Sequence, residues 1–200
     1  MRAHHNDDPD CDWGEVVRFL RRVRARLPRA ARPRRREPER RVKPSEYIGF
    51  VPTPMRVVRR MLELAEIQPG ETVYDLGCGD GRILISAARK YGAFGVGIEI
   101  DRDRIQEARR RAEPFPDRIT FRRQNVFDTG LRRADVVMIY LLPTLNAKLM
   151  PRLRRLKPGV RIVSHSFELP GVKACKTARV KCPDGYSHDI FVYRTPLRKA

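Results

Sequence analysis

The feature of this chain that most constrains its fold is the segment from Val73 to Arg82, with the sequence VYDLGCGDGR. An apolar, β-prone run leads into alternate glycines at positions 77, 79 and 81. Glycine has no Cβ, so this backbone can adopt positive φ and lie directly against a ligand. Apolar residues at helical spacing follow and stop at Gly92. A strand, a glycine turn and a helix predict the opening unit of a doubly wound α/β domain, whose ligand lies at the carboxyl ends of the strands.

The glycine spacing indicates which cofactor this loop binds. A dinucleotide fingerprint has glycine at the first, third and sixth positions of the turn, and Arg82 stands at the sixth position here. A phosphate-binding P-loop would end in Gly-Lys-Ser or Gly-Lys-Thr, which the segment lacks. S-adenosylmethionine fits better, because Asp75 can bind its ammonium and the positive helix end faces its carboxylate. Glu99, after the strand from 94 to 98, stands where an acidic residue binds both ribose hydroxyls.

Further candidate cofactor contacts lie in the glycine loop and after the third strand. Cys78 and Gly81 belong to the loop itself, and Gly77 and Gly79 flank the cysteine. The third strand, 119 to 123, leads to Asn125, Val126 and Phe127. Asn125 could hydrogen-bond the adenine edge, while Val126 and the aromatic residue could cover its faces. The alternative interpretation is a polar loop with one core aromatic residue.

Alternating strand and helix patterns continue on both sides of this region. Thr53 is expected to cap a helix with Pro54 at its first position, and Asp101 to cap a helix from 102 to 112. The other expected elements are strands at 134–140 and 161–167, a helix at about 145–156, and β-rich segments at 177–181 and 189–193. The pattern predicts a Rossmann-like α/β sheet with helices on both faces and a C-terminal antiparallel hairpin.

Composition divides the chain into two parts. The formal net charge is +19, from 43 Lys and Arg against 24 Asp and Glu. Residues 1–44 form an Arg- and Pro-rich arm, and residues 45–200 carry the α/β pattern. Within the arm, residues 13–27 have apolar side chains at helical spacing, which indicates either a membrane or partner helix or a helix packed on its own domain. The arm is therefore predicted to favour anionic surfaces, either membrane or nucleic acid.

Cysteine usage and hydropathy bear on metal binding and location. The four cysteines fall at no zinc-binding spacing, so no metal site is predicted: they are Cys11, Cys78, Cys175 and Cys182. A reduced, cytoplasmic setting follows as the simplest expectation. No apolar run approaches the ~20 residues of a membrane span, and no signal peptide is recognisable. Membrane contact is therefore expected only at the periphery, and no oligomeric state is predicted.

The tip of the fourth predicted strand, next to the glycine loop, is expected to face the transferred methyl group. It reads Tyr140, Leu141, Leu142 and Pro143. Enzymes that methylate base amino groups commonly place Asn or Asp, two prolines and an aromatic residue there, and this chain does not. The apolar pair suits a narrow channel for an alkyl chain ending in an amine, which the Tyr140 hydroxyl could orient. The alternative is a tyrosine buried at a sheet edge, and His165 is predicted to be structural rather than a base.

Several motifs together resemble the archaeal protein-lysine methyltransferases and their mitochondrial relatives. The resemblance covers about residues 45 to 195, and its most specific parts are FVPTP and IYLLP. The motifs that carry it are YIGFVPTP, VYDLGCGDGR, GIEID, ADVVMIYLLP and LKPGVRIVSHSF. The resemblance implies a class I enzyme that moves methyl groups from S-adenosylmethionine to lysine side chains of proteins.

The same resemblance implies residue roles. Asp75, Gly77, Gly79 and Glu99 would bind the cofactor, Tyr47 and Thr53 would close over its methionine end, and Tyr140 would lie at the amine channel. Two features depart from the family pattern: Asn125 replaces a more usual acid near adenine, and the arm before Pro44 matches nothing in it. Two alternatives stay open, a methyltransferase of RNA or DNA, suggested by the charge, and a binding module that keeps the fold without catalysis.

Overall fold

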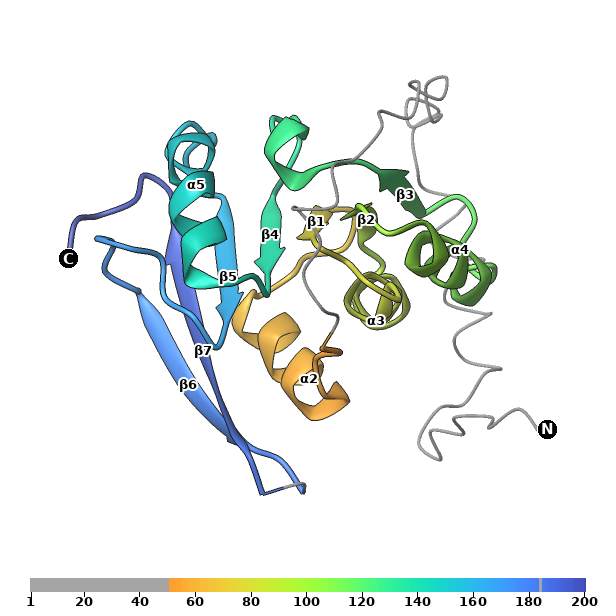
Figure 1. Cartoon of the computed structure of the whole chain (residues 1–200), viewed down its shortest axis with the longest axis horizontal. Coiled ribbons are helices and arrows are strands. Elements are labelled where there is room, and N and C mark those ends of the chain that lie inside the picture. The colour runs from red at the N-terminus through yellow and green to blue at the C-terminus, as the bar shows by residue number, and fades with distance from the viewer. Residues whose placement is uncertain (1–50, 184) are drawn as a thin grey trace. The chain divides into compact units, whose positions relative to one another are not determined.

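The computed structural model describes residues 51–183 and 185–200, which form one α/β unit (Figure 1). Its sheet has seven strands in the order β3-β2-β1-β4-β5-β7-β6. The first five strands run parallel, and β7 pairs antiparallel with both β5 and β6. The strands are β1 (Thr72–Leu76), β2 (Phe94–Glu99), β3 (Ile119–Arg123), β4 (Val136–Ile139), β5 (Arg161–His165), β6 (Lys176–Lys181) and β7 (Ser187–Arg194).

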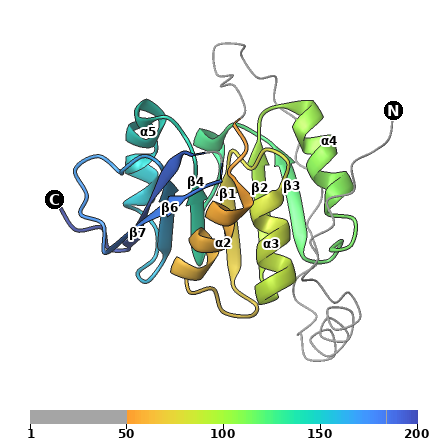
Figure 2. The same ribbon diagram turned by 90° about the horizontal axis from the view of Figure 1, so that it is seen from below.

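Helices cover both faces of this sheet. They are α2 (Met55–Leu64), α3 (Arg82–Tyr91), α4 (Arg102–Arg111) and α5 (Pro143–Leu153), with a short 3-10 helix, η2 (Val126–Asp128). Figure 2 shows α2 and α3 together on one face, and α5 lies on the other. This arrangement confirms the predicted Rossmann-like fold with a C-terminal antiparallel pair of strands. Across residues 51–183 and 185–200, no helix is both long and apolar enough to span a bilayer.

Strand register decides which side chains reach the face covered by α2 and α3. Asp75 stands opposite Gly97 on β2 and Met138 on β4, and residues directly opposite each other in a sheet share a face. Tyr140 follows Met138 by two positions, so it continues on that face. The opposite face is an apolar core in which β-strand side chains pack with Leu149, Met150 and Leu153 of α5. Asp75 and Tyr140 therefore both lie on the α2 side of the sheet.

Several predicted boundaries needed correction. The prediction that Thr53 caps α2 was wrong, because Pro54 is the N-cap and makes no side-chain cap hydrogen bond. Helix α5 begins two positions before the expected start, since Pro143 suits the first turn of a helix. Strand β5 stops at His165 because Ser166 has a left-handed φ of 63°. The Asp101 cap is confirmed, with its side chain accepting from the next helical N–H groups.

The predictions made for Tyr47 and for the arm of residues 1–44 lie outside the described residues and stay predictions. The same holds for the boundary at residue 44 and for the candidate helix over 13–27. The described part of the functional region therefore starts at the residues just before α2.

Candidate functional site

The glycine loop joins β1 to α3 at the carboxyl edge of the sheet. Gly77, Gly79 and Gly81 have φ of 84°, 52° and 78°, all in the left-handed region that glycine favours. The backbone N–H groups of Gly77 and Cys78 both donate to the carbonyl of Ile98, at 2.8 and 3.0 Å. The loop is thus fastened to the end of β2.

Two loop residues have packing reasons for their identity. A Cβ on Gly81 would lie 2.8 Å from the Phe121 ring, so this glycine permits close contact between α3 and β3. The thiol of Cys78 is buried beside Gly97, where a Cβ would lie 2.7 Å from the sulfur. Burial also raises the pKa of the Cys78 thiol. The side chain of Cys78 is therefore a core group, and any contact that this residue makes with a ligand falls to its backbone.

Asp75 is the residue whose surroundings are best suited to bind a polar group of a ligand. It is 3% exposed, and its Oδ2 atom has no hydrogen-bond partner among the described residues. Burial raises the pKa of Asp75 to about 8, and the carboxylates of Glu99 and Asp80 act in the same direction. A buried carboxyl group with unmet hydrogen-bonding capacity is suited to an incoming cationic donor. The site therefore fits the ammonium end of S-adenosylmethionine.

Glu99 ends β2 directly beside the glycine loop. Its Oε2 accepts a hydrogen bond from Gly79 N at 3.0 Å, and its Oε1 accepts from Ile100 N and Asp101 N at 2.8 and 3.0 Å. These contacts fix the carboxylate in place and use three of its roughly four acceptor sites. Glu99 therefore both holds the loop and presents a carboxylate at its rim.

The residues expected around adenine form the short turn after β3. Asn125 is the N-cap of η2, and its Oδ1 accepts from Phe127 N at 3.0 Å. Val126 and Phe127 are both half-buried. The side-chain oxygen predicted to meet adenine therefore already accepts a hydrogen bond within this turn.

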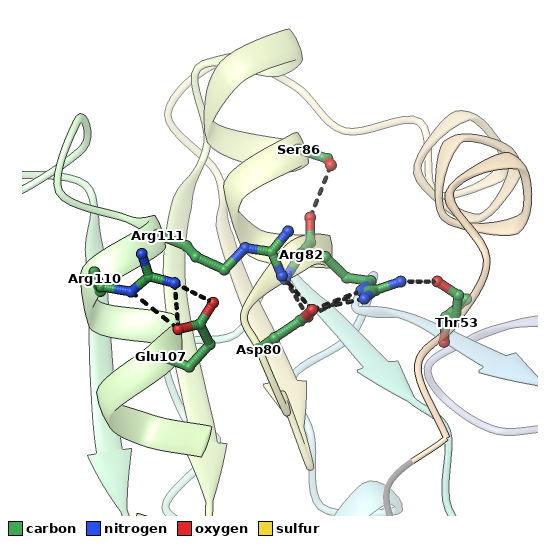
Figure 3. A network of polar contacts seen from close by, with 7 residues as sticks. All are labelled: Thr53, Asp80, Arg82, Ser86, Glu107, Arg110 and Arg111. Carbon is green, nitrogen blue, oxygen red and sulfur yellow. Dashed lines mark hydrogen bonds and ion pairs between the residues drawn. The ribbon is translucent and has the colours of Figure 1, made fainter. Parts of the chain in front are cut away.

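A largely buried ion-pair network is centred on Asp80, which stands between Gly79 and Gly81 in the glycine loop (Figure 3). Asp80 is 8% exposed and pairs with Arg82 at 2.6 Å and with Arg111 of α4. Burial alone would raise the pKa of Asp80, but hydrogen bonds from Arg82 and the charges of both arginines hold it below its usual value. Arg82 also donates to the backbone carbonyl of Thr53 at 3.0 Å. The network thereby ties the segment before α2 to the cofactor loop.

Aromatic rings are in contact at the tip of β4. The Tyr140 ring lies 3.9 Å from the His165 ring, centroid to centroid, and 6.4 Å from that of Phe167. His165 Nδ1 lies 3.2 Å from Thr53 Oγ1, and its Nε2 lies 2.9 Å from His188 Nδ1. Thr53 therefore contacts the cofactor side through its carbonyl and the Tyr140 side through its hydroxyl.

His165 is suited to hold its neighbours rather than to accept a proton. Burial lowers its pKa to about 4, and His188 acts in the same direction. At neutral pH the imidazole is uncharged and a weak base, so it holds the Tyr140 ring by a tilted ring contact and the Thr53 hydroxyl by a hydrogen bond. This agrees with the structural role predicted for His165.

The structure thus brings most predicted site residues to one edge of the sheet. Glu99 and Gly79 are hydrogen-bonded, and Leu141 lies close enough to Gly77 to meet a Cβ there at 3.1 Å. Sequence reasoning missed the network of Asp80 and Arg82 and the pairing of Thr53 with His165. Asp80 and Arg82 stand inside the recognised motif, but Arg111 and Thr53, which they also contact, lie 31 and 29 positions away, too far for a spacing rule to find. No group of three or more potential metal ligands occurs in the part of the chain that the structure describes.

Known proteins resemble this chain over most of the described fold. The family model of the ANTKMT methyltransferase domain matches residues 75–176. A protein-lysine N-methyltransferase from Saccharolobus islandicus is 41% identical over 152 residues, which cover 74% of this chain and 93% of that protein. A lysine N-methyltransferase of ATP synthase from Caenorhabditis elegans is 27% identical over 65% of this chain and 70% of that protein.

A solved structure is similar in both sequence and fold. It is described as an RNA methyltransferase from Salinibacter ruber in complex with S-adenosyl-L-homocysteine. Its sequence is 43% identical, its TM-score is 0.69, and the match covers 73% of this chain and 94% of that chain. The bound S-adenosyl-L-homocysteine of that structure is the product that remains after S-adenosylmethionine has given up its methyl group.

Proposed function

The chain belongs to the ANTKMT methyltransferase domain family of S-adenosylmethionine-dependent methyltransferases, and on that premise we propose that it methylates lysine side chains of proteins. The observation that carries this proposal is the 41% identity to a protein-lysine N-methyltransferase across 93% of that protein's length. The more distant relative from Caenorhabditis elegans is also a lysine N-methyltransferase by name.

The cofactor site is proposed to consist of residues from β1, the glycine loop and β2. Asp75 would bind the ammonium of S-adenosylmethionine, the backbone of the loop would lie along its methionine end, and Glu99 would bind its ribose. When bound, the cofactor supplies a methyl group on an electrophilic sulfonium. Thr53 would help to close the methionine end, because Arg82 holds its backbone against the loop.

At the acceptor side the chain must favour a neutral amine. A free lysine has a pKa of about 10.4, so most of it is charged at neutral pH. Apolar surroundings disfavour that charge, and the tip of β4 provides them with Leu141 and the partly exposed Leu142. Tyr140, held by His165, would orient the amine through its hydroxyl. The protein's contribution is therefore desolvation and alignment of the nucleophile.

Labelled S-adenosylmethionine provides the direct test of lysine methylation. With the full-length protein and a cell extract, we expect alkali-resistant label in protein, recovered as methylated lysine after hydrolysis. The Glu99→Ala variant is the matched control, since it should lose this label. Label confined to nuclease-sensitive material would contradict the proposal.

Methylation of RNA is the second candidate. The 43% identical structure described as an RNA methyltransferase favours it, as does the net charge of +19. Against it, the tip of β4 reads Tyr-Leu-Leu-Pro and lacks the Asn or Asp, double proline and aromatic residue typical of enzymes that methylate base amino groups. The same labelling experiment separates the two candidates.

Tyr140→Phe should separate catalysis from cofactor binding. The phenyl ring can still contact the His165 ring, so only the hydroxyl is lost. We expect turnover to fall about tenfold through poorer alignment of the amine, with the Kd for S-adenosylmethionine nearly unchanged. Single-turnover methylation and calorimetry would measure the two quantities. Tyr91→Phe, at the end of α3, is the control. Equal losses of turnover and cofactor affinity in Tyr140→Phe would contradict the role.

We also propose a cytoplasmic location from the cysteines, because Cys78, Cys175 and Cys182 are all free thiols.

The arm of residues 1–44 is proposed to attract anionic membrane or nucleic acid through its basic residues. Deleting the arm should weaken sedimentation with anionic vesicles or binding to RNA.

A further inference from the structure

A basic groove lies between α2 and the strand β6 at the end of the sheet. It has a volume of about 900 Å³. Five cationic side chains line it, together with Glu63 and neutral residues: Arg56, Arg59, Arg60, Arg179 and Lys181. We name this hollow the α2/β6 groove.

The α2/β6 groove opens beside the proposed acceptor site. Pro54 and Met55 line it, and they follow Thr53, which contacts His165 behind Tyr140. Strand β6 runs toward the same edge, because Lys181 pairs with Ser187 beyond the end of β5. Figure 1 shows the β6–β7 hairpin extending past the tip of β5 alongside α2. A chain lying in the groove would therefore pass close to the Tyr140 site.

Three of the groove cations have no carboxylate partner among the described residues. Arg60 pairs with Glu63 and Arg179 pairs with Asp189, whereas no ion pair joins Arg56, Arg59 or Lys181 to a carboxylate within residues 51–183 and 185–200. The side chains of Arg56 and Arg59, both on α2, are exposed to solvent. The groove thus carries a local excess of positive charge that an anionic partner could neutralise.

The amphipathic pattern of α2 accounts for charged side chains on its exposed face, but not for the positive sign of the charge at Arg56 and Arg59. Arg56 lies in the first turn of the helix, which contains no acidic residue, and a cation there opposes the helix dipole. Cations on β6 have a general explanation, because they disfavour edge-to-edge pairing of end strands. That explanation does not reach Arg56 and Arg59, which lie on a helix. Their placement points to an interaction with an external anion.

We propose that the α2/β6 groove binds an acidic segment of the protein substrate close to the lysine to be methylated. The proposal rests on the proposed lysine methylation and adds a substrate class to it. Carboxylates flanking the target lysine would pair with Arg56, Arg59 and Lys181, while the lysine extends toward Tyr140. Exposed ion pairs of this kind set orientation and encounter rate more than they set affinity.

Two fluorescent peptides test the groove with the full-length protein. One carries a single lysine flanked by Glu and Asp, and the other has Gln and Asn at the same positions. By fluorescence anisotropy we expect the acidic peptide to bind about tenfold more tightly at low salt, with the difference shrinking as salt rises. The double variant Arg56→Glu/Arg59→Glu should abolish the preference.

The matched control is Arg132→Glu/Arg133→Glu. It makes the same change in net charge at two exposed arginines before β4, away from the groove-lining residues. This variant should keep the preference for the acidic peptide. Equal binding of the two peptides, an unchanged preference in the groove variant, or an equal loss in the control would each overturn the proposal. The proposal would also be overturned if the groove variant bound a single-stranded RNA more weakly but bound both peptides as the wild type does.

The experiments can contradict the groove proposal and the proposed lysine methylation separately. Lysine-borne label on the two peptides that does not depend on Arg56 or Arg59 would overturn the groove and leave the proposed function. A preference for the acidic peptide that needs both arginines, without any lysine-borne label, would overturn lysine methylation and leave an acidic-peptide site.

Discussion

Replacing Glu99 by alanine should weaken S-adenosylmethionine binding about 100-fold, as measured by calorimetry. Three backbone N–H groups leave the carboxylate about one further acceptor site, which is expected to take a ribose hydroxyl, and a charge-assisted bond of this type contributes about 1.5–3 kcal/mol. The substitution also removes the acceptor of Gly79 N, Ile100 N and Asp101 N. We therefore expect the free energy of unfolding to fall as well, by about 2 kcal/mol.

Two further variants separate these effects of Glu99. Glu99→Gln keeps one oxygen but loses the charge, so we expect a smaller loss of affinity, of about tenfold. Asp101→Ala removes the nearby cap of α4, whose carboxylate accepts from Asp103 N and Arg104 N. It should cost about 1 kcal/mol of stability and leave the cofactor Kd nearly unchanged. An equal loss of affinity in Glu99→Ala and Asp101→Ala would assign the effect to disorder of this region rather than to ribose contacts.

Sequence reasoning succeeds where the determining interactions are local. The order of β1, loop, α3 and β2 follows from hydrophobic spacing and glycines within fewer than thirty residues. Asp75 and Glu99 are recognisable because each stands at or near the end of its own strand. The register then places Asp75 on the face covered by α2 and α3, where Tyr140 also lies. Alternation along strands makes this outcome predictable once the strand order is known.

The errors arise where a contact distant in sequence competes with a local rule. Thr53 has the side chain of a good helix cap, but its hydroxyl lies against His165, which is 112 positions away. Asp80 resembles an ordinary loop residue until α4 brings Arg111 to it. Gly81 and Cys78 stay predicted ligand contacts, and packing near Phe121 and Gly97 adds a reason for their small side chains that the sequence does not reveal. One-dimensional patterns contain no information on these neighbours.

The cofactor-free protein should lose stability as pH rises from about 4 to about 8, because of Asp75. Its pKa in the folded protein is raised to about 8 from an ordinary value of 3.8, chiefly by burial. The folded state therefore holds a proton that the unfolded chain has released across this window. The stabilisation is complete below the unfolded pKa and is lost as pH rises through the folded pKa. Its full size is on the order of 5 kcal/mol.

Asp75→Asn removes this titration, so its free energy of unfolding should exceed that of the wild type by an amount that grows between pH 5 and pH 8. Denaturant unfolding at several pH values measures the difference, in which the other titrating groups cancel. Asp135→Asn is the control with the opposite sign, because hydrogen bonds from Lys157 and Thr72 hold the pKa of Asp135 below its usual value despite burial. That variant should lose stability at neutral pH. Parallel pH profiles for the wild type and Asp75→Asn would contradict the prediction.

The same titration predicts how cofactor binding responds to pH. The ammonium of S-adenosylmethionine should favour the ionised form of Asp75, so binding near pH 7 should release a proton and tighten as pH rises toward 8. Calorimetry in two buffers of different ionisation enthalpy measures the released proton directly. Asp75→Asn should bind more weakly and release none at this site. Proton release that persists unchanged in Asp75→Asn would assign it to another group and would contradict the proposed contact between Asp75 and the ammonium.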